Sequence, residues 1–198
     1  MDARRINDRF MLGICCGLLA VVGLSVIASE PVAAQAGQKG ALVSIDGLSS
    51  RAPAEWKEVN NPRQFRYKEF VLPRQGDDKL DAELIIFYFG EGGGGGVEAN
   101  IARWKGMFEP PSGKTIDQVS KREEFKVGDV KVTYLDITGT YLYKPFPMAP
   151  QAERRPDHRM IAVVFESPKG PYFFRLVGPE KTVTHHKKAF DEWLRNFK

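Results

Sequence analysis

The chain has 198 residues and a formal net charge of +4 at pH 7, which is enough sequence for one domain with a sizeable core. Charges of both signs are spread along the chain, so it is not expected to bind nucleic acid. The only two cysteines, Cys15 and Cys16, lie in the amino-terminal segment. The rest of the chain therefore offers no residue for a disulfide, a thiol nucleophile or a thiolate metal site.

The amino-terminal segment has the composition of an export signal. Three arginines precede an uncharged, mostly apolar stretch at 10–29, and the small residues Ala34 and Ala36 follow in an A-x-A pattern. We predict a signal peptide over residues 1–36 that is cleaved after Ala36, which makes the protein exported, either periplasmic or secreted. The apolar stretch is also long enough to cross a bilayer, so an uncleaved membrane anchor is the alternative.

After the signal, we predict a lead-in segment at 37–52 with a short edge strand, and one globular domain at 53–198. Turn-forming residues at 128–129 and 167–170 predict two β-hairpins. Runs of apolar and β-branched residues predict strands at 65–72, 82–89, 122–127, 130–138, 160–166 and 172–177.

Two segments have apolar residues at helical spacing. Val97, Ile101, Trp104 and Phe108 predict a helix at 97–108, and a similar stripe predicts another at 180–197. Three of the predicted strands are apolar almost throughout, which is typical of strands inside a sheet that is covered on both faces. The predicted fold is therefore α+β: an α/β/α sandwich with a central, mostly antiparallel sheet and a helix on each face.

Several features appear in an order known from one superfamily. Trp56 precedes a strand that ends at Leu72 and Pro73, and a Gly-rich loop leads into a helix at 100–104. The last helix ends with Ala189, Phe190, Leu194 and Phe197. In these features residues 53–198 resemble the PsbP-like superfamily, nearest to its uncharacterised exported bacterial members. The superfamily includes an extrinsic photosystem subunit and the Mog-type Ran-binding proteins. The resemblance implies the same sandwich and a non-catalytic binding or assembly role, but no family binding residue can be matched here.

The Gly-rich segment at 90–96 contains G-x-G-x-x-G as Gly90, Gly92 and Gly95. It follows a predicted strand and opens a predicted helix, where backbone N–H groups can bind phosphate. However, no Gly-Lys-Ser/Thr sequence follows, and the next strands form a hairpin and not a parallel crossover. We interpret the segment as a flexible connection whose glycines adopt positive φ, and we predict no nucleotide or other cofactor.

The remaining titratable residues form no recognisable site. His185 and His186 are adjacent, and helix neighbours point about 100° apart, so they cannot readily bind one ion and are interpreted as solvated. His158 lies in a predicted loop. Glu123 and Glu124 would face opposite sides of a strand. With no nucleophile-elbow sequence either, neither a catalytic residue nor a metal ligand is predicted.

The predicted connection at 143–159 is long and contains four prolines. Because prolines restrict the backbone, the segment can present Phe146 and Met148 to a partner at low entropic cost. Arg154 and Arg155 would add a basic rim suited to carboxylates or phosphates. These four are the candidate partner-binding residues. In the alternative, Phe146 and Met148 pack back onto the sheet and the arginines are only solvated.

The leading hypothesis is therefore a non-catalytic, exported binding or assembly module that acts on a protein or another envelope component. The first alternative is a small hydrolase or metal-dependent enzyme that uses His158 together with acidic or histidine side chains from elsewhere. The second is a structural envelope protein that an uncleaved segment at 10–29 holds in the membrane. The sequence does not identify the partner.

Overall fold

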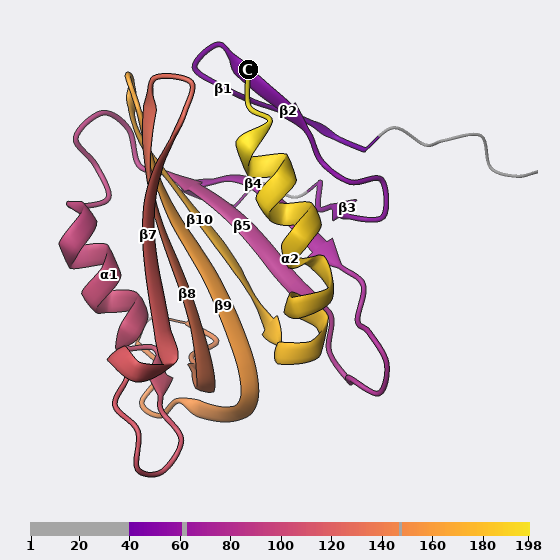
Figure 1. Cartoon of the computed structure of the whole chain (residues 1–198), viewed down its shortest axis with the longest axis vertical. Helices are drawn as coiled ribbons and strands as arrows, with labels where there is room; N and C mark the ends of the chain where they lie inside the picture. Colours follow the sequence, from indigo (N-terminus) through magenta and orange to yellow (C-terminus); the bar gives the residue numbers. More distant parts are fainter. Residues whose placement is uncertain (1–39, 61–62, 147) are drawn as a thin grey trace, which may run out of the picture. The chain divides into compact units, whose positions relative to one another are not determined.

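The computed structural model describes residues 40–60, 63–146 and 148–198 (Figure 1). The predicted signal at 1–36, with its cleavage residues Ala34 and Ala36, lies outside these residues. In the part of the chain that is described, no helix has the length and hydrophobicity needed to cross a bilayer.

Eight strands of the described chain form one sheet in which each pairing is antiparallel. They follow the order β3-β4-β5-β10-β9-β8-β6, and β7 also pairs with β8. Their bounds are β3 Lys57–Glu58, β4 Arg66–Leu72, β5 Ala82–Tyr88, β6 Phe108–Glu109, β7 Ser120–Val127, β8 Val130–Tyr143, β9 Glu153–Ser167 and β10 Gly170–Pro179. The helices are α1 Val97–Lys105 and α2 Glu180–Arg195, with a short 3₁₀ helix η1 at Asp117–Val119. The predicted α+β class with a mostly antiparallel sheet is confirmed.

The two predicted hairpins are confirmed, but two strands extend further than the sequence suggested. Turns at 128–129 and 168–169 join β7 to β8 and β9 to β10. β8 continues to Tyr143 and β9 begins at Glu153, so the predicted connection at 143–159 is wrong in length and spans only 144–152. Polar residues and Pro156 hide the start of β9 in the sequence, whereas the structure pairs its backbone with 141–143.

Both helices end earlier than their apolar stripes predict. α1 stops at Lys105, because Gly106 caps it and the chain turns so that Phe108 begins β6. α2 stops at Arg195, yet Phe197 beyond it is still buried. An apolar side chain can therefore continue a helical pattern in sequence and reach the core from outside the helix.

The segment at 42–51 forms a separate hairpin of β1 Leu42–Ile45 and β2 Leu48–Arg51. Asp46 and Gly47 make its two-residue turn, and both have positive φ, as a tight hairpin turn requires. Val43 and Ile45 are fully buried with the side chains of α2. Backbone hydrogen bonds in both directions join Ser49 to Lys198. The hairpin therefore belongs to the same core as the end of the chain.

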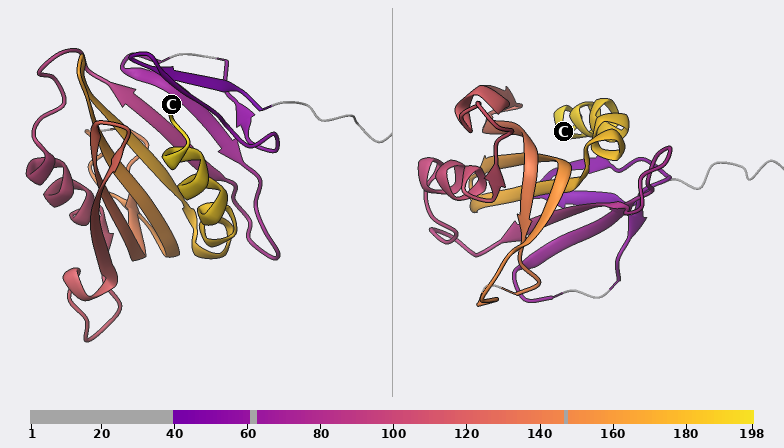
Figure 2. Two further views of the ribbon diagram at one scale, coloured as in Figure 1. Left: turned by 45° about the horizontal axis from the view of Figure 1, so that its top comes forward. Right: turned by 90° about the horizontal axis from the view of Figure 1, so that it is seen from below.

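Two clusters of buried side chains make the core. Alternate residues of one strand belong to different clusters, since successive strand residues point to opposite faces. In β10, Phe174 belongs to the cluster that contains Phe190 of α2, whereas Phe173 and Val177 belong to the one that contains Trp104 of α1. The sheet twists strongly (Figure 2). The cavity described next is lined both by Arg63, which precedes β4, and by Lys144 and Pro145, which follow β8.

Candidate functional site

A cavity of about 330 Å³ opens over the ends of β4, β5, β8, β9 and β10. Five cationic side chains and two carboxylates are among the described residues that line it. We call it the arginine basin, and its lining comprises Arg63, Arg66, Leu80, Asp81, Glu83, Tyr141, Tyr143, Lys144, Pro145, Arg155, His158, Arg175, Val177 and Gly178. Its size falls within the range of small-ligand pockets, and its excess of cations suits an anionic group.

Strand register brings Arg175 and Glu83 to the floor of the basin. Arg175 lies between Phe173 and Val177 at two-residue spacing, so the three side chains share one face of β10. Glu83 of β5 pairs directly with Val177, which makes it a diagonal neighbour of Arg175. Each is a single charged residue within an apolar strand of the sheet interior.

A β-bulge aims Arg155 and His158 at the same cavity. Gly139 pairs with His158 and Tyr141 pairs with Arg155, so β9 has one extra residue between the two pairs. Asp157 takes up the extra length with a φ of 52°. Gly139 is required opposite it, because a Cβ at this position would lie 2.6 Å from the carbonyl oxygen of Glu109.

Arg66 and Arg155 are held by neighbouring carboxylates. The Arg66 guanidinium lies 2.7 Å from a Glu69 oxygen and 3.4 Å from a Glu83 oxygen. Arg155 donates two hydrogen bonds to Glu153, of 3.0 and 3.1 Å, and its guanidinium lies 3.6 Å from the centre of the Tyr143 ring. Both arginines are thus fixed in position before any ligand arrives, which lowers the entropic cost of binding one.

Arg175 is the exception. Its Nε is buried and has no hydrogen-bond partner among the described residues, and its guanidinium carbon lies 5.3 Å from the centre of the Phe87 ring. Buried polar groups in folded proteins almost always have a partner, because an unpaired donor keeps its full desolvation cost. An acceptor from a ligand in the basin would pair with the guanidinium, and it would reach Nε itself only after a shift of the side chain.

Burial shifts the protonation of the basin's own groups. It raises the pKa of Glu83, against the opposing effect of Arg175 and Arg66. Burial also raises the pKa of Tyr141 and lowers that of His158 below its usual value near 6.5. Near neutral pH His158 is therefore uncharged, and the positive charge of the basin comes from its arginines and Lys144.

The structure separates the four candidate partner-binding residues. Phe146 and Met148 are 56% and 87% exposed, on the connection whose Lys144 lines the basin. Arg155 faces the basin from β9, whereas Arg154 points to Glu109, 2.6 Å away. The connection therefore forms one rim of the basin.

The histidine predictions need correction. His158 lies on β9 and not in a loop, and it is only 8% exposed. Its Nδ1 lies 2.7 Å from the carbonyl oxygen of Pro156, which can only accept, so Nδ1 carries the proton. His186 is not solvated, since it is buried with Nε2 2.9 Å from the Pro73 carbonyl oxygen, whereas His185 is exposed. Among the described residues no three His, Cys, Asp or Glu side chains are grouped to hold a metal ion.

The Gly-rich segment at 90–96 is fixed by its neighbours. Four of its glycines have positive φ, as predicted. The side-chain amide of Asn100 donates to the carbonyl oxygens of Gly94, Gly95 and Gly96 at 2.9 to 3.3 Å. A Cβ at Gly94 would lie 2.3 Å from the Phe173 ring. The glycines thus allow close packing, and no basin residue comes from this segment.

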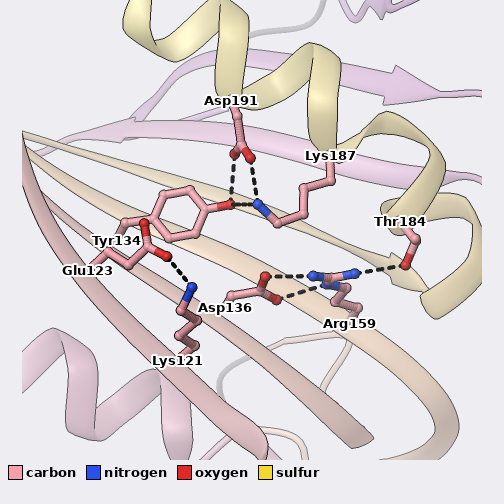
Figure 3. Close-up of polar contacts among 8 residues, drawn as sticks. All are labelled: Lys121, Glu123, Tyr134, Asp136, Arg159, Thr184, Lys187 and Asp191. Carbon is pink, nitrogen blue, oxygen red and sulfur yellow. Dashed lines mark hydrogen bonds and ion pairs between the residues drawn. The ribbon is translucent and has the colours of Figure 1, made fainter.

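A second polar cluster joins β8 and β9 to α2 (Figure 3). The Tyr134 hydroxyl donates to Asp191 at 2.8 Å and accepts from Lys187 at 3.0 Å. Arg159 donates to both oxygens of Asp136, at 2.8 and 2.6 Å, and to the Thr184 hydroxyl at 2.8 Å. Each of these groups finds a hydrogen-bond partner within the cluster, so the cluster has a structural role. We call it the paired network.

The sequence prediction missed most of the basin. Arg66, Glu83, Tyr141 and Arg175 were assigned only to strands or their connections. The sequence does contain one signal: Arg175 and Glu83 are isolated charges in otherwise apolar strands. A charge in that position is costly unless it is paired or has a function.

No protein-family model matches the chain, and no curated protein matches it. Similar solved structures include PA94, a protein of unknown function from Pseudomonas aeruginosa, with 13% identity over 78% of this chain and 93% of that one, and a TM-score of 0.45. They also include the cyanobacterial PsbP (CyanoP) of Synechocystis sp. PCC 6803, with 14% identity over 83% of this chain and 95% of that one, and a TM-score of 0.46. A PsbP protein is thus among the similar solved structures, as the resemblance in the sequence predicts, and with TM-scores below 0.5 neither similarity carries an argument about this chain.

Proposed function

We propose that this chain is a non-catalytic, exported binding or assembly module that binds an anionic group of an envelope partner in the arginine basin. The partner is a protein or another envelope component. One observation carries the proposal: five cationic side chains face two carboxylates in a single cavity, and the buried Nε of Arg175 has no partner among the described residues. Such a site is costly for folding and favourable for an anion.

The rim residues extend this surface. Phe146 and Met148 are large, exposed and next to Lys144, so they can add apolar contact around an anionic anchor. Arg154, which lies 2.6 Å from Glu109, would add a second cation to the rim besides Lys144. The proposed partner contacts are therefore Phe146, Met148 and Arg154, together with Arg155 of the basin.

The three-layer arrangement is part of the proposal. Alternate side chains of β9 and β10 divide between the cluster of α1 and that of α2, which supports a helix on each face of the sheet. In that α/β/α arrangement α1 covers only part of its face, and the basin occupies the remainder.

Photo-crosslinking in the native cell envelope tests the proposal. Benzoylphenylalanine in place of Phe146 is expected to crosslink to a discrete partner, whereas the same group at the exposed Leu42 of β1 serves as the control. When benzoylphenylalanine at position 146 is combined with Arg66→Gln and Arg175→Gln, the crosslink should disappear while the protein stays folded. Equal crosslinking from Leu42, or a crosslink that survives both substitutions, would contradict the proposal.

Export has its own test. Mass spectrometry of the mature protein should find an amino terminus at Gly37, directly after Ala36. A chain that retains residues 10–29 and stays in the membrane fraction would instead support the membrane-anchored structural alternative.

A hydrolase that uses His158 is the second candidate, because Asp81 and Glu83 line the same cavity. With the proton on Nδ1, the Nε2 of His158 is free to accept one, as a general base must. The discriminating measurement is hydrolysis of nitrophenyl esters and phosphates. Turnover that is lost in His158→Gln, while anion binding is retained, would favour the enzyme over the binding module.

A further inference from the structure

A second cavity, of about 190 Å³, adjoins the arginine basin next to α1. Its walls are mostly aromatic and apolar, formed by Phe87, Phe89, Trp104, Met107 and Phe173, with Arg103 at the side. Arg175 lines both cavities. We call the second one the apolar cavity.

Strand geometry makes the two cavities neighbours. On β10, Phe173 lines the apolar cavity and Val177 lines the basin, with Arg175 midway between them on the same face. On the adjacent β5, Phe87 and Glu83 repeat this division. Because alternate strand residues lie about 7 Å apart, the surface changes from apolar to cationic over a distance that one small molecule spans.

Arg175 marks the boundary. Its neighbour Arg103 hydrogen-bonds to the Asn100 side chain, so that cation already has a partner within α1. The buried Nε of Arg175 has none among the described residues. A guanidinium offers a planar set of donors that matches a carboxylate or a phosphate.

We propose that the two cavities together bind a small amphiphilic anion, with its acidic head on Arg175 in the basin and its apolar chain in the apolar cavity. The inference rests on the proposed function, since it names the ligand class of the same basin. A bare inorganic anion would leave the aromatic walls without contacts, and an uncharged hydrocarbon would bury Arg175 further without an acceptor. The apolar cavity has room for on the order of six water-sized groups, which suits a chain of six to eight carbons.

The same head-and-chain chemistry can come from a free alkyl acid or from a phospholipid. The test therefore compares octyl phosphate with inorganic phosphate and octanol in solution, and vesicles of phosphatidylglycerol with vesicles of phosphatidylcholine. Protein purified after export is titrated by calorimetry and by tryptophan fluorescence. Trp104 lines the apolar cavity, whereas Trp56 and Trp193 belong to the other core cluster, so Trp104→Phe should remove the signal.

Octyl phosphate is expected to bind about tenfold or more tightly than either inorganic phosphate or octanol, since both ends of the ligand contribute. Arg175→Met should weaken this binding about tenfold, and Arg175→Lys, which keeps the charge and loses the planar donors, by a smaller factor. Arg51→Met is the control, because Arg51 is exposed on β2 and outside both cavities. Sedimentation with phosphatidylglycerol vesicles alone, lost in Arg175→Met, would assign a membrane lipid, and binding only in solution a free amphiphile.

Three results would overturn the inference. If octyl phosphate binds no tighter than inorganic phosphate, and both depend on Arg175, the chain has no place in the site and only the anion basin of the proposed function stands. If the Arg175→Met and Arg175→Lys proteins bind octyl phosphate as tightly as the unsubstituted protein does, the site lies elsewhere. Failure of every anion and of both vesicle types to bind would overturn the basin as well.

Discussion

Two arginines on adjacent strands of the sheet have opposite surroundings. Arg159 of β9 donates to both oxygens of Asp136 and to Thr184, and its side chain and that of Asp136 are only 17% and 12% exposed. The side chain of Arg175 of β10 has a buried Nε with no hydrogen-bond partner among the described residues. Arg159 ends the polar half of β9, whereas Arg175 interrupts an apolar run of β10, and only Arg159 has its partners within the described part of the fold.

The difference separates residues that hold the fold together from residues kept for another purpose. A buried donor without an acceptor destabilises the folded state, because it loses its hydrogen bond to water and forms no other. A local conflict of this kind is expected at functional sites and is offset by stability elsewhere. The paired network of Arg159 therefore explains part of the stability, and the unpaired Nε of Arg175 lies at the proposed binding site.

The largest expected effect is on the paired network. Arg159→Met leaves Asp136 partly buried without its cation, which should lower the free energy of unfolding by about 2–3 kcal/mol. Urea unfolding followed by circular dichroism measures the loss, with the exposed Arg51→Met as the control that should change it by less than about 0.5 kcal/mol. A loss below about 1 kcal/mol for Arg159→Met would mean that the network does not stabilise the fold as its geometry suggests.

A smaller effect is expected at the other group of the paired network, around Tyr134. Tyr134→Phe removes the hydroxyl that donates to Asp191 and accepts from Lys187, although those two groups remain paired with each other. Because the carboxylate keeps one partner, the loss should be about 1 kcal/mol, less than for Arg159→Met. The same urea series compares the two losses in the free energy of unfolding. A larger loss for Tyr134→Phe than for Arg159→Met would mean that the contacts of Tyr134 with α2 stabilise the fold more than the Arg159–Asp136 pair does.

Most of the sheet was predictable from local signals. Turn residues at 128–129 and 167–170 and long apolar runs identified both hairpins, since these signals act over a few neighbouring residues. The bulge at Asp157 and the polar start of β9 were not predictable, because their pattern depends on which strand lies opposite.

The basin was harder to predict from the sequence than the sheet. Its charged floor depends on the pairing of β5 with β10, which are far apart in the chain, so no spacing in the sequence brings Glu83 next to Arg175. The rim was partly anticipated, since the proline-rich connection was singled out and Arg155 does face the cavity. Arg154 could not be distinguished from Arg155 without knowing the face of each on β9.

For Arg175 itself the expected stability effect is slight. Arg175→Met removes the unpaired donor and keeps most of the apolar stem, while Arg66 remains to oppose the charge of Glu83. The free energy of unfolding should therefore change by less than about 1 kcal/mol, in contrast to Arg159→Met. The matched pair of Arg→Met proteins is compared in one urea series, and a loss above about 2 kcal/mol at Arg175 would assign it to the core and remove the contrast between the two arginines.

The smallest expected effect concerns Glu83 and the pH dependence of anion binding in the basin. Burial raises the pKa of Glu83, and Arg66, Glu69, Arg175 and Tyr141 are the charged or titratable groups that act on it. A raised pKa in the folded state means that the stability linked to the protonated carboxyl is fully present below the unfolded pKa and is lost as pH rises through the folded one. The same protonation makes the basin more positive, so anion affinity should rise as pH falls through this window.

Glu83→Gln fixes the neutral form. At neutral pH it should strengthen binding of inorganic phosphate about two- to fivefold, the magnitude of one partly screened charge interaction, and flatten the pH profile. His158 also lines the basin and its lowered pKa places its protonation at more acidic pH, so the profile is repeated in His158→Gln. If the pH dependence disappears in His158→Gln and persists in Glu83→Gln, the histidine controls the charge of the basin, and Glu83 serves only as an ion-pair partner of Arg66.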